Sequence, residues 1–481
     1  MNTQLLINGE HRAAADGRSY DRIDPVTGAV ASTAAAAGDG DALAAVAAAH
    51  AAFPGWSRRA PQERRALLLK AAAAMEARMD DFIAAAMAET GATGPWIGFN
   101  VTLAAGILRE AASIVTQAGG EVIPSNKPGC LSMAMARPHG VCLGIAPWNA
   151  PVILGTRALA VPVALGNTAV LKSSEMCPET HRLIGQCFVD AGFPPGVVNV
   201  ISNAPEDAGT IVETLIRAPE VRHVNFTGST RVGRIIGRLA GENLKPVLLE
   251  LGGKAPFVVL EDADIDAAVN AAIFGCYMNQ GQICMSTERM IVVDSVADEF
   301  AQKFAARAAA LPAGDPRGQV VLGGLCLPGA ADRMEELIAD ATAKGGRVLA
   351  GGSRDGAVVA ATVIDGVTPE MRIHSEESFG PVKPIIRVRD EAEALRVAND
   401  SDYGLSSAVF SRDIRRAMGF AEQLETGICH INGPTVNDEP QAPFGGVKAS
   451  GHGRFGGKAG IAEFTQLRWI TIEDPGQPYP F

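Results

Sequence analysis

A carboxylate and a thiol occupy two glycine-containing segments in the middle of the chain. Glu250 opens the segment ELGGK (250–254), and Cys284 lies within GQICMS (281–286). A cysteine thiolate can attack an electrophilic carbon, and a carboxylate can activate the water that releases the product. The two residue types therefore predict covalent catalysis, provided that the fold brings Cys284 and Glu250 together.

A turn between a predicted strand and a predicted helix is a candidate seat for a phosphate. The segment FTGSTRVG (226–233) places Gly228 in the turn and Ser229 at the start of the helix. A helix start presents free backbone N–H groups and the positive end of the helix dipole, and both attract a pyrophosphate. The alternative is an ordinary helix capped by Ser229 or Thr230, because the spacing differs from the usual G-x-G-x-x-G fingerprint.

Two further polar segments follow predicted strands. Lys172 and Glu175 follow the strand-like run 168–171, where they could bind ribose hydroxyls, since ligands of doubly wound sheets bind at the carboxyl ends of strands. An acid beside the 2′-hydroxyl repels a 2′-phosphate, which favours NAD over NADP. The second segment is PWNAP (147–151), in which the side-chain N–H of Asn149 could stabilise an oxyanion. The alternatives are a solvated charged loop for the first segment and a proline turn for the second.

The size and charge of the chain limit its partners. With 481 residues the chain is too long for one hydrophobic core, so two or three domains are expected. A net charge of −11 argues against a nucleic-acid partner, because phosphate binding needs clustered lysines and arginines. The N-terminus lacks the features of a signal peptide, and the uncharged stretch 138–156 is interrupted by prolines, so no membrane segment is predicted.

The cysteines are expected to be reduced. Eight are present, and they form neither a C-x-x-C pair nor a Cys/His cluster with zinc spacing. A large chain with such cysteines is typical of the cytoplasm. No metal site is predicted.

Strands and helices alternate along most of the chain. Ala-rich helices are expected at 41–52 and 61–90, and from residue 140 short apolar runs alternate with helical stretches as far as residue 251. Such alternation predicts a parallel, doubly wound sheet. A second alternating series from residue 263 predicts another α/β domain. The proline-containing tail 470–481 is expected to be an extended arm or a frayed terminus.

From about residue 5 to its end, the chain resembles the aldehyde dehydrogenase superfamily. The segments that carry the resemblance are PWNAP (147–151), KSSE (172–175), FTGSTRVG (226–233), ELGGK (250–254), GQICMS (281–286), EESFGPV (376–382) and PFGGVKASGHGR (443–454). The resemblance implies an α/β fold with a Rossmann-like, doubly wound cofactor domain, a second α/β catalytic domain and a small β oligomerisation arm. A homodimer or homotetramer is implied as well.

The resemblance also implies domain limits. The NAD-binding domain would comprise 1–119 and 139–250, and the catalytic domain 251–430. The arm would comprise 120–138 and 460–481, while 431–459 return to the cofactor domain.

Roles for individual residues follow from the same resemblance. Cys284 corresponds to the nucleophile, Glu250 to the general base, and Asn149 with the backbone N–H of Cys284 to the oxyanion hole. The implied reaction is NAD-dependent oxidation of an aldehyde to the carboxylic acid through a cysteine thiohemiacetal and a thioester. The implied cofactor contacts are Trp148, Lys172, Ser174, Glu175, Gly228, Ser229, Gly233, Leu251, Glu377 and Phe379.

Two positions depart from the pattern of many members. Ala158 stands where many have a lysine, and Arg157 precedes it; Arg157 is expected to face the substrate, the alternative being a buried, paired charge. The residue after the oxyanion asparagine is the small Ala150 instead of a bulky aromatic residue, which leaves room for a ring.

The substrate is expected to be a monocyclic aromatic aldehyde. Candidate walls of its pocket are Trp96, Phe99, Tyr277 and Phe444, for which the alternative is ordinary core packing. The segments 94–101, 281–289, 431–446 and 453–473 resemble the aromatic-aldehyde branch of the superfamily, which includes salicylaldehyde and vanillin dehydrogenases. The alternative is a semialdehyde or aliphatic aldehyde dehydrogenase that uses NAD(P).

Overall fold

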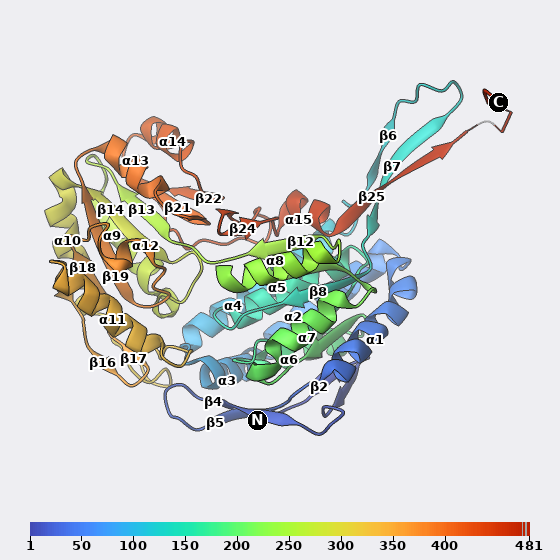
Figure 1. Cartoon of the computed structure of the whole chain (residues 1–481), viewed down its shortest axis with the longest axis horizontal. Coiled ribbons are helices and arrows are strands. Elements are labelled where there is room, and N and C mark those ends of the chain that lie inside the picture. Colours follow the sequence, from blue (N-terminus) through green and yellow to red (C-terminus); the bar gives the residue numbers. More distant parts are fainter. Residues whose placement is uncertain (474, 477–478) are drawn as a thin grey trace.

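The protein has two bodies, each built around a β-sheet, and a thin arm extends from one of them (Figure 1). The structure is a computed structural model that describes residues 1–473, 475–476 and 479–481. The predicted α/β fold with two sheet-containing parts and a small β arm is confirmed. Of the predicted extended tail, Asp474, Gln477 and Pro478 lie outside the described residues. No helix in the described ranges has the length and apolar character needed to cross a membrane.

The larger sheet has eight strands, and its central strands are parallel. In spatial order they are β24 (Gly451–His452), β12 (Val247–Glu250), β11 (Val221–Thr227), β8 (Val141–Ile145), β9 (Thr168–Lys172), β10 (Val198–Ile201), β2 (Leu5–Ile7) and β3 (Glu10–Arg12). The helices that connect the parallel strands are α5 (Pro151–Ala164), α6 (Pro178–Asp190), α7 (Ala208–Arg217) and α8 (Thr230–Glu242).

Helices cover both faces of this sheet, which explains why the residues of its central strands are almost all buried. Successive strand residues point to opposite faces, so Cys142 of β8 joins one hydrophobic cluster and Leu143 joins another. The register pairs Ile145 with Lys172, and Thr227 with Glu250. The polar segments that follow these strands therefore meet at one edge of the sheet, as expected for a doubly wound fold.

The second sheet has seven strands, of which β15 is antiparallel to its neighbour. In spatial order they are β15 (Arg347–Ala350), β18 (Thr362–Asp365), β19 (Val382–Val388), β14 (Thr287–Val293), β13 (Ala255–Val259), β21 (Ser406–Phe410) and β22 (Ile428–Ile431). Its helices are α9 (Ile265–Tyr277), α10 (Asp294–Ala309), α11 (Ala330–Ala343), α12 (Arg372–Ser375), α13 (Glu391–Asn399) and α14 (Ile414–Ala421).

The chain passes from the first sheet to the second within a few residues. Strand β12 ends at Glu250, and β13, which the sequence pattern did not separate from it, begins at Ala255 in the other sheet. The apolar sequence on both sides of this link hides the change of sheet. The segment 251–254 thus lies where the two bodies meet.

A helical layer precedes the first parallel strand. The predicted helix 61–90 is two helices, because Arg78 leaves helical geometry with φ −103° and ψ 21°. The fourth helix of this layer was not predicted, and it packs against both α2 and α5. The helices are α1 (Asp39–Ser57), α2 (Pro61–Ala77), α3 (Met79–Thr90) and α4 (Gly94–Ile114).

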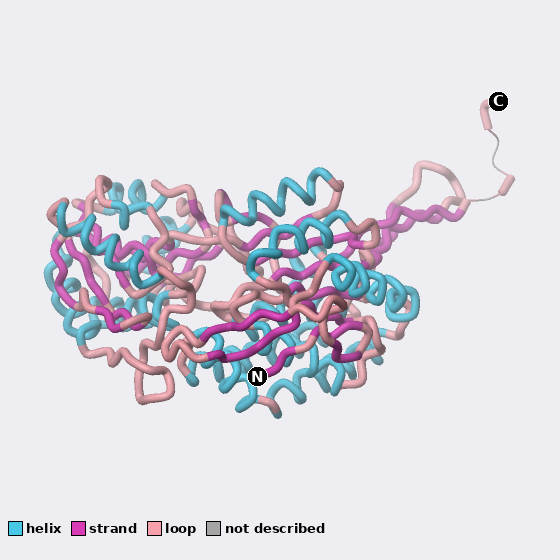
Figure 2. Tube along the Cα trace, turned by 60° about the horizontal axis from the view of Figure 1, so that its bottom comes forward, coloured by secondary structure: helices cyan, strands magenta, loops and turns pink. Residues whose placement is uncertain are grey.

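The arm is a three-stranded antiparallel sheet that projects from the first body (Figure 2). Its strands are β6 (Gly120–Ile123), β7 (Leu131–Pro138) and β25 (Thr465–Ile472), with β7 in the middle. The remaining elements are β1 (Asn2–Thr3), β4 (Ser19–Ile23), β5 (Val30–Ala35), β16 (Arg354–Asp355), β17 (Val358–Val359), β20 (Tyr403–Gly404), β23 (Val447–Lys448), η1 (Pro205–Asp207), η2 (Met278–Gly281) and α15 (Gly457–Glu463).

Candidate active site

The segment that carries Cys284 follows a turn with unusual backbone geometry. In η2 the residues Asn279, Gln280 and Gly281 have φ angles of 49°, 55° and 74° in succession. Residues other than glycine rarely adopt this left-handed conformation, so tertiary contacts must hold it. Asn279 Nδ2 donates to the backbone oxygen of Asn149 (2.9 Å), and Gln280 Nε2 donates to a backbone carbonyl oxygen (3.1 Å). The two amides fix the turn from which Cys284 is presented.

Asn149 lies beside the same segment, four residues beyond the end of β8. Its Nδ2 donates to the backbone oxygen of Gln282 (3.0 Å), and its own backbone oxygen accepts from Trp96 Nε1 (3.1 Å). Gln282 precedes Cys284 by two residues. The Asn149 amide is therefore held close to the position where an attacked carbonyl would develop negative charge.

Glu250 is buried opposite Cys284. The residue is 1% exposed, and neither carboxylate oxygen has a hydrogen-bond partner at normal distance among the described residues. Burial raises the pKa of Glu250 to about 7, and the neighbouring thiol of Cys284 opposes the rise. Burial, and then the charge of Glu250, raise the pKa of Cys284 well above its usual range. A carboxyl group of this kind can serve as a base near neutral pH.

The two glycines after Glu250 allow close backbone contacts on both sides. A Cβ atom on Gly253 would lie 2.6 Å from the backbone oxygen of Cys284, and one on Gly252 would lie 2.7 Å from Oε2 of Glu377. The Gly253 N–H donates to Glu377 Oε1 (2.9 Å). Burial raises the pKa of Glu377 to about 7, although this N–H opposes the rise. The link between the sheets thus holds Glu377 and Cys284 close together.

A buried ionic network centred on Glu288 joins the link between the sheets, the strand that follows Cys284 and the turn before Phe379. Glu288 Oε2 accepts from Lys254 Nζ (2.8 Å) and from the backbone N–H of Ser378 (2.8 Å). Its Oε1 accepts from Lys383 Nζ (2.7 Å) and from the Ser378 hydroxyl (2.6 Å). Burial alone would raise the pKa of Glu288, but the two lysines lower it to about 2. Phe379, next in the chain, has a φ of 49°, so the network also holds a strained turn.

A cleft of about 410 Å³ opens above these groups. Trp148 and Phe379 meet edge to face in it, with ring centroids 5.8 Å apart. Ser229 caps α8 by accepting from the Val232 N–H (3.4 Å), which leaves the first N–H groups of the helix at the cleft. Of the site residues predicted from sequence, those that line the cleft are Trp148, Asn149, Gly228, Ser229, Glu250, Cys284, Glu377 and Phe379.

The remaining predicted cofactor contacts lie outside the walls of this cleft. Lys172 and Glu175 form an ion pair at the carboxyl end of β9, and Asn203 Nδ2 donates to the same carboxylate (3.1 Å). Ser174 shapes the turn between them, because its hydroxyl oxygen accepts the Met176 N–H (3.2 Å). In α8, the absence of a side chain on Gly233 makes room for Leu251, a close contact between helix and sheet.

The predicted substrate residues belong to two environments. Trp96, Ala150 and Phe444 are in one buried hydrophobic cluster, against which Cys284 packs; Phe99 stacks on Trp96 with ring centroids 5.7 Å apart but is 47% exposed and lies outside the cluster. Tyr277 lies elsewhere, in the core of the second body. Its hydroxyl donates to a backbone oxygen there (3.2 Å), which is the core packing that the sequence left open.

Arg157 is a buried, paired charge. Its Nη2 forms an ion pair with Asp438 Oδ2, and its guanidinium lies 4.6 Å from the centroid of the Phe444 ring. The sequence favoured a position facing the substrate and left the paired state as the alternative. Asp438 was not among the predicted site residues, because 281 positions separate it from Arg157 and no motif joins them.

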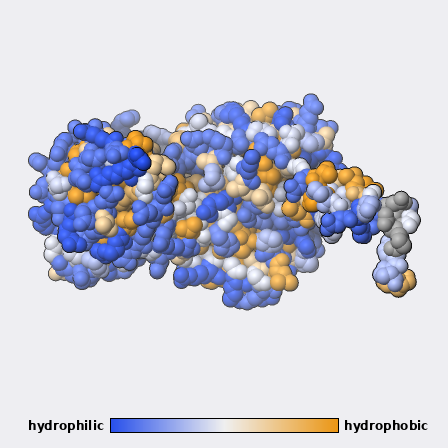
Figure 3. All heavy atoms as spheres, turned by 90° about the horizontal axis from the view of Figure 1, so that it is seen from above, coloured by the Kyte–Doolittle hydropathy of each residue, from blue (hydrophilic) through white to orange (hydrophobic). Residues whose placement is uncertain are grey.

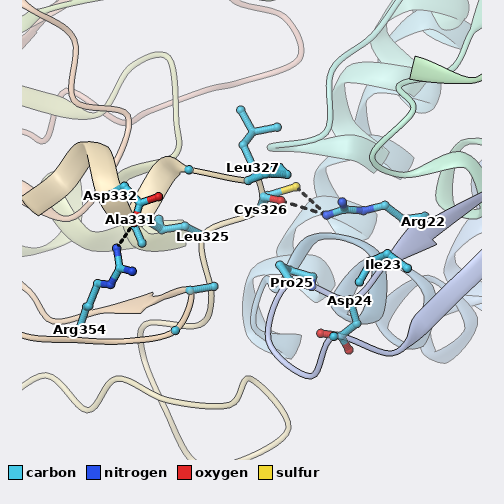
Figure 4. Close-up of a pocket in the computed structure, with 15 residues that line it drawn as sticks. Arg22, Ile23, Asp24, Pro25, Leu325, Cys326, Leu327, Ala331, Asp332 and Arg354 are labelled. Carbon is cyan, nitrogen blue, oxygen red and sulfur yellow. Dashed lines mark hydrogen bonds and ion pairs between the residues drawn. The ribbon is translucent and has the colours of Figure 1, made fainter. Parts of the chain in front are cut away.

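A second cavity, of about 320 Å³, lies between the N-terminal hairpin, formed by β4 and β5, and the second body (Figure 4). On its wall, Arg22 donates to the backbone oxygens of Glu89 (2.7 Å) and Cys326 (3.0 Å). The N–H of Cys326 in turn donates to Oε1 of Gln282 (3.0 Å). The hairpin is therefore connected to the nucleophile segment through two hydrogen bonds that local sequence could not indicate. Among the described residues no group of three or more His, Cys, Asp or Glu side chains could hold a metal ion.

Comparisons with known proteins show the family and the fold of the chain. A model of the aldehyde dehydrogenase family matches residues 11–470. Vanillin dehydrogenase from Pseudomonas sp. strain HR199 is 60% identical over 481 residues and all of both chains, and salicylaldehyde dehydrogenase from Pseudomonas sp. strain C18 is 49% identical over 483 aligned positions and all of both chains. The crystal structure of a salicylaldehyde dehydrogenase from Pseudomonas putida G7, complexed with salicylaldehyde, superposes with a TM-score of 0.98, at 49% identity and full coverage of both chains.

A Gly253→Ala substitution tests the close contact beside Cys284. The added methyl group would lie 2.6 Å from a backbone oxygen, so the nucleophile segment must shift. We expect kcat/KM for aldehyde oxidation to fall about 100-fold, the effect of a displacement of about 1 Å in a catalytic group. Gly241→Ala in α8 is the control, because apart from its chain neighbours and the nearby backbone of its own helix no described atom lies within 4 Å of its Cβ position. Equal activity of the two variants in an NADH-formation assay would contradict the prediction.

Proposed function

We propose that this chain, which belongs to the aldehyde dehydrogenase family, oxidises a monocyclic aromatic aldehyde to the carboxylic acid with NAD as the hydride acceptor. The observation that carries the proposal is the placement of Cys284, Asn149 and the unpartnered carboxylate of Glu250 in one cleft. Each of the three supplies one element of thiol-dependent aldehyde oxidation.

Cys284, as thiolate, attacks the aldehyde carbon and forms a thiohemiacetal. Because the surroundings favour the neutral thiol, its proton must pass to solvent before the attack, which leaves Glu250 free to act in the second step. The Asn149 amide and the Cys284 N–H stabilise the oxyanion. NAD, when bound, accepts the hydride that leaves the substrate carbon, and a thioester remains on the cysteine. Glu250 then removes a proton from the water that hydrolyses this thioester.

The residues around the cleft suit a dinucleotide. The start of α8 and the adjacent Gly228 offer backbone N–H groups for a pyrophosphate. We assign Glu377 to a ribose near the reacting end, and Lys172 with Glu175 to the adenosine ribose. The charge of Glu175 at that position favours NAD over NADP. In this proposal residues 1–119 and 139–250 hold the cofactor, and residues 251–430 carry the nucleophile.

Three features support an aromatic substrate. Ala150, next to the oxyanion donor, leaves more space than a larger side chain would. Trp96 and Phe444 belong to the cluster against which Cys284 packs, and flat apolar surfaces suit a ring. Two relatives are named for aromatic aldehydes: the vanillin dehydrogenase that is 60% identical to this chain, and the salicylaldehyde dehydrogenase of known structure.

NADH formation with a panel of aldehydes tests the proposal. We expect higher kcat/KM for benzaldehyde, salicylaldehyde and vanillin than for succinic semialdehyde and short aliphatic aldehydes, because only the rings fill the apolar pocket. At saturating aldehyde, kcat/KM for NADP should be lower than kcat/KM for NAD. Preference for an aliphatic aldehyde would overturn the substrate assignment, and preference for NADP would overturn the cofactor assignment.

The pH dependence of turnover tests the role of Glu250. Because its pKa is about 7, the carboxyl is protonated below pH 7 and cannot accept a proton, so kcat should fall on the acid side with a midpoint near this value. Glu250→Gln should lower steady-state turnover about 100- to 10,000-fold. Mass spectrometry should then detect an acyl group on Cys284. Cys284→Ala, the control, should show no acyl adduct. A Glu250→Gln variant with wild-type turnover and pH profile would refute the assignment.

We further propose that the arm joins copies of the chain in the reducing cytoplasm. Its edge strand β25 has free backbone groups, and Leu467 and Trp469 on it are each 73% exposed. Apolar atoms gather on this arm (Figure 3). The eight cysteines are unpaired, as a reducing compartment requires.

Light scattering tests the assembly. We expect the mass of a dimer or tetramer for the wild type and a smaller mass after Leu467→Glu and Trp469→Glu are combined, because charges would replace exposed apolar groups. Ile414→Glu is the control, since Ile414 is 55% exposed on α14, away from the arm. A monomeric wild type would refute the proposal.

A further inference from the structure

We propose that Asp438, held in place by Arg157, accepts a hydrogen bond from a hydroxyl group on the aromatic ring of the substrate. The inference rests on the proposed function, and it names a specificity-determining residue together with the chemical feature that the residue recognises. It makes ring hydroxylation, beyond aromaticity alone, a basis of substrate choice.

Arg157 lies on helix α5, about two turns beyond the oxyanion donor. Ala150 caps α5 directly after Asn149, and Arg157 follows it by seven residues. Helix positions seven apart lie on one face, about 10 Å apart along the axis. A benzaldehyde whose carbonyl oxygen meets Asn149 would therefore extend along this face past Ala150 toward Arg157.

Asp438 reaches the same place from the loop between β22 and β23. One carboxylate oxygen, Oδ2, pairs with Nη2 of Arg157, and the two side chains are only 9% and 6% exposed. The other oxygen, Oδ1, is buried and has no hydrogen-bond partner among the described residues. A buried acceptor without a donor is energetically unfavourable, so a ligand that supplies a donor gains by occupying this position.

Arg157 holds the Asp438 carboxylate in position to accept a hydrogen bond from a ligand. Its guanidinium lies 4.6 Å from the centroid of Phe444 and 5.8 Å from that of Phe455, so aromatic rings fix its position. The ion pair gives the nearly buried Asp438 a cationic partner, and it leaves one carboxylate oxygen free. A charged acceptor binds a hydroxyl more strongly than a neutral acceptor does.

The pair is close to the reacting groups but outside the cofactor cleft. The charges of Arg157 and Asp438 both act on the pKa of Glu250, with opposite signs. None of Arg157, Asp438 and Phe444 lines that cleft, whereas Phe444 and Ala150 belong to the cluster against which Cys284 packs. The nucleophile is thus bordered by the cleft on one side and by these residues on another.

The chemistry of the free oxygen defines the ligand. Oδ1 can only accept, so it recognises a donor such as a phenolic hydroxyl and gains nothing from an ether oxygen, which is itself only an acceptor. A hydroxybenzaldehyde and its methyl ether differ in this donor and have similar shapes. Their comparison isolates the contact.

The experiment measures kcat/KM for ortho-, meta- and para-hydroxybenzaldehyde, for the three corresponding methoxybenzaldehydes and for benzaldehyde. The wild type should prefer at least one hydroxyl compound over its ether. In Asp438→Asn the value for that compound should fall about 10- to 100-fold, the worth of a hydrogen bond to a charged group. Most of this loss should appear in KM, because the contact is present in both ground and transition states. The ether should change less than about threefold, within ordinary variation.

Two other variants complete the test. Glu439→Gln changes the exposed neighbour of Asp438 and should leave all values unchanged. Asp438→Glu keeps the charge opposite Arg157 but moves the carboxylate by one methylene, so it should reduce the preference for the hydroxyl compound while the melting temperature stays near that of the wild type. The Asp438→Glu variant therefore still tests the proposal if Asp438→Asn does not fold.

Three results would overturn the inference. The first is equal loss for the hydroxyl compound and its ether in the variants, which would make the ion pair purely structural. The second is a wild type that does not distinguish the two compounds at any ring position. The third is an Asp438→Glu enzyme with unchanged preference. A wild type that oxidises no aromatic aldehyde would instead refute the proposed function, so the two failures are distinguishable.

Discussion

The site depends on a carboxylate that is buried without a hydrogen-bond donor. Glu250 lies at the end of a strand, and its oxygens have no partner at normal distance among the described residues. Burial of such a group is costly unless its pKa shifts, and its pKa is raised to about 7. The same burial makes the carboxylate useful, because a base with this pKa can accept protons near neutral pH. Because no other donor in the described part of the chain is near, the groups left to interact with the Glu250 carboxylate are the Cys284 thiol and, in the proposed reaction, the water used in hydrolysis.

A second buried carboxylate in the site, that of Glu288, is by contrast fully hydrogen-bonded. Glu288 receives hydrogen bonds from two lysines and from both the backbone and the hydroxyl of Ser378. A buried carboxylate paired in this way remains ionised, and its removal would leave two buried cations uncompensated. The network also joins the link between the sheets, the nucleophile strand and the turn before Phe379. It therefore fixes the relative positions of segments that must all face the cleft.

Two ligands have to approach one sulfur atom, and the structure borders it with two different surfaces. The cleft offers helix N–H groups, a glycine turn and a carboxylate, which suit a charged dinucleotide. The other surface offers an apolar cluster and one ion pair, which suit a small ring. In the function proposed above, the reaction depends on the residues that the two surfaces share, and substrate choice depends on those that only the second contains. Variation at Ala150, Arg157 or Asp438 could thus change the substrate without changing the chemistry.

Much of the fold followed from the sequence, and its errors have physical causes. The alternation of apolar runs and helical stretches predicted the parallel sheet, because such patterns reflect burial on both faces. Strand β13 was missed, because an apolar sequence on both sides of two glycines does not reveal that the chain changes sheets there. Helix α4 was missed in a segment that begins with glycine and proline, and its packing against α2 and α5 stabilises it.

For the site, the sequence by itself determined the chemistry, and the tertiary structure decided the environment. Cys284, Glu250 and Asn149 could be named from residue type and local context, because a thiol, a carboxylate and an amide have intrinsic reactivities. The pKa of Glu250, the burial of Tyr277 in another core and the pairing of Arg157 with Asp438 could not be named in this way. Desolvation and ion pairing depend on distances between atoms, and the two members of that pair are 281 positions apart in the sequence, so only the folded chain brings them together.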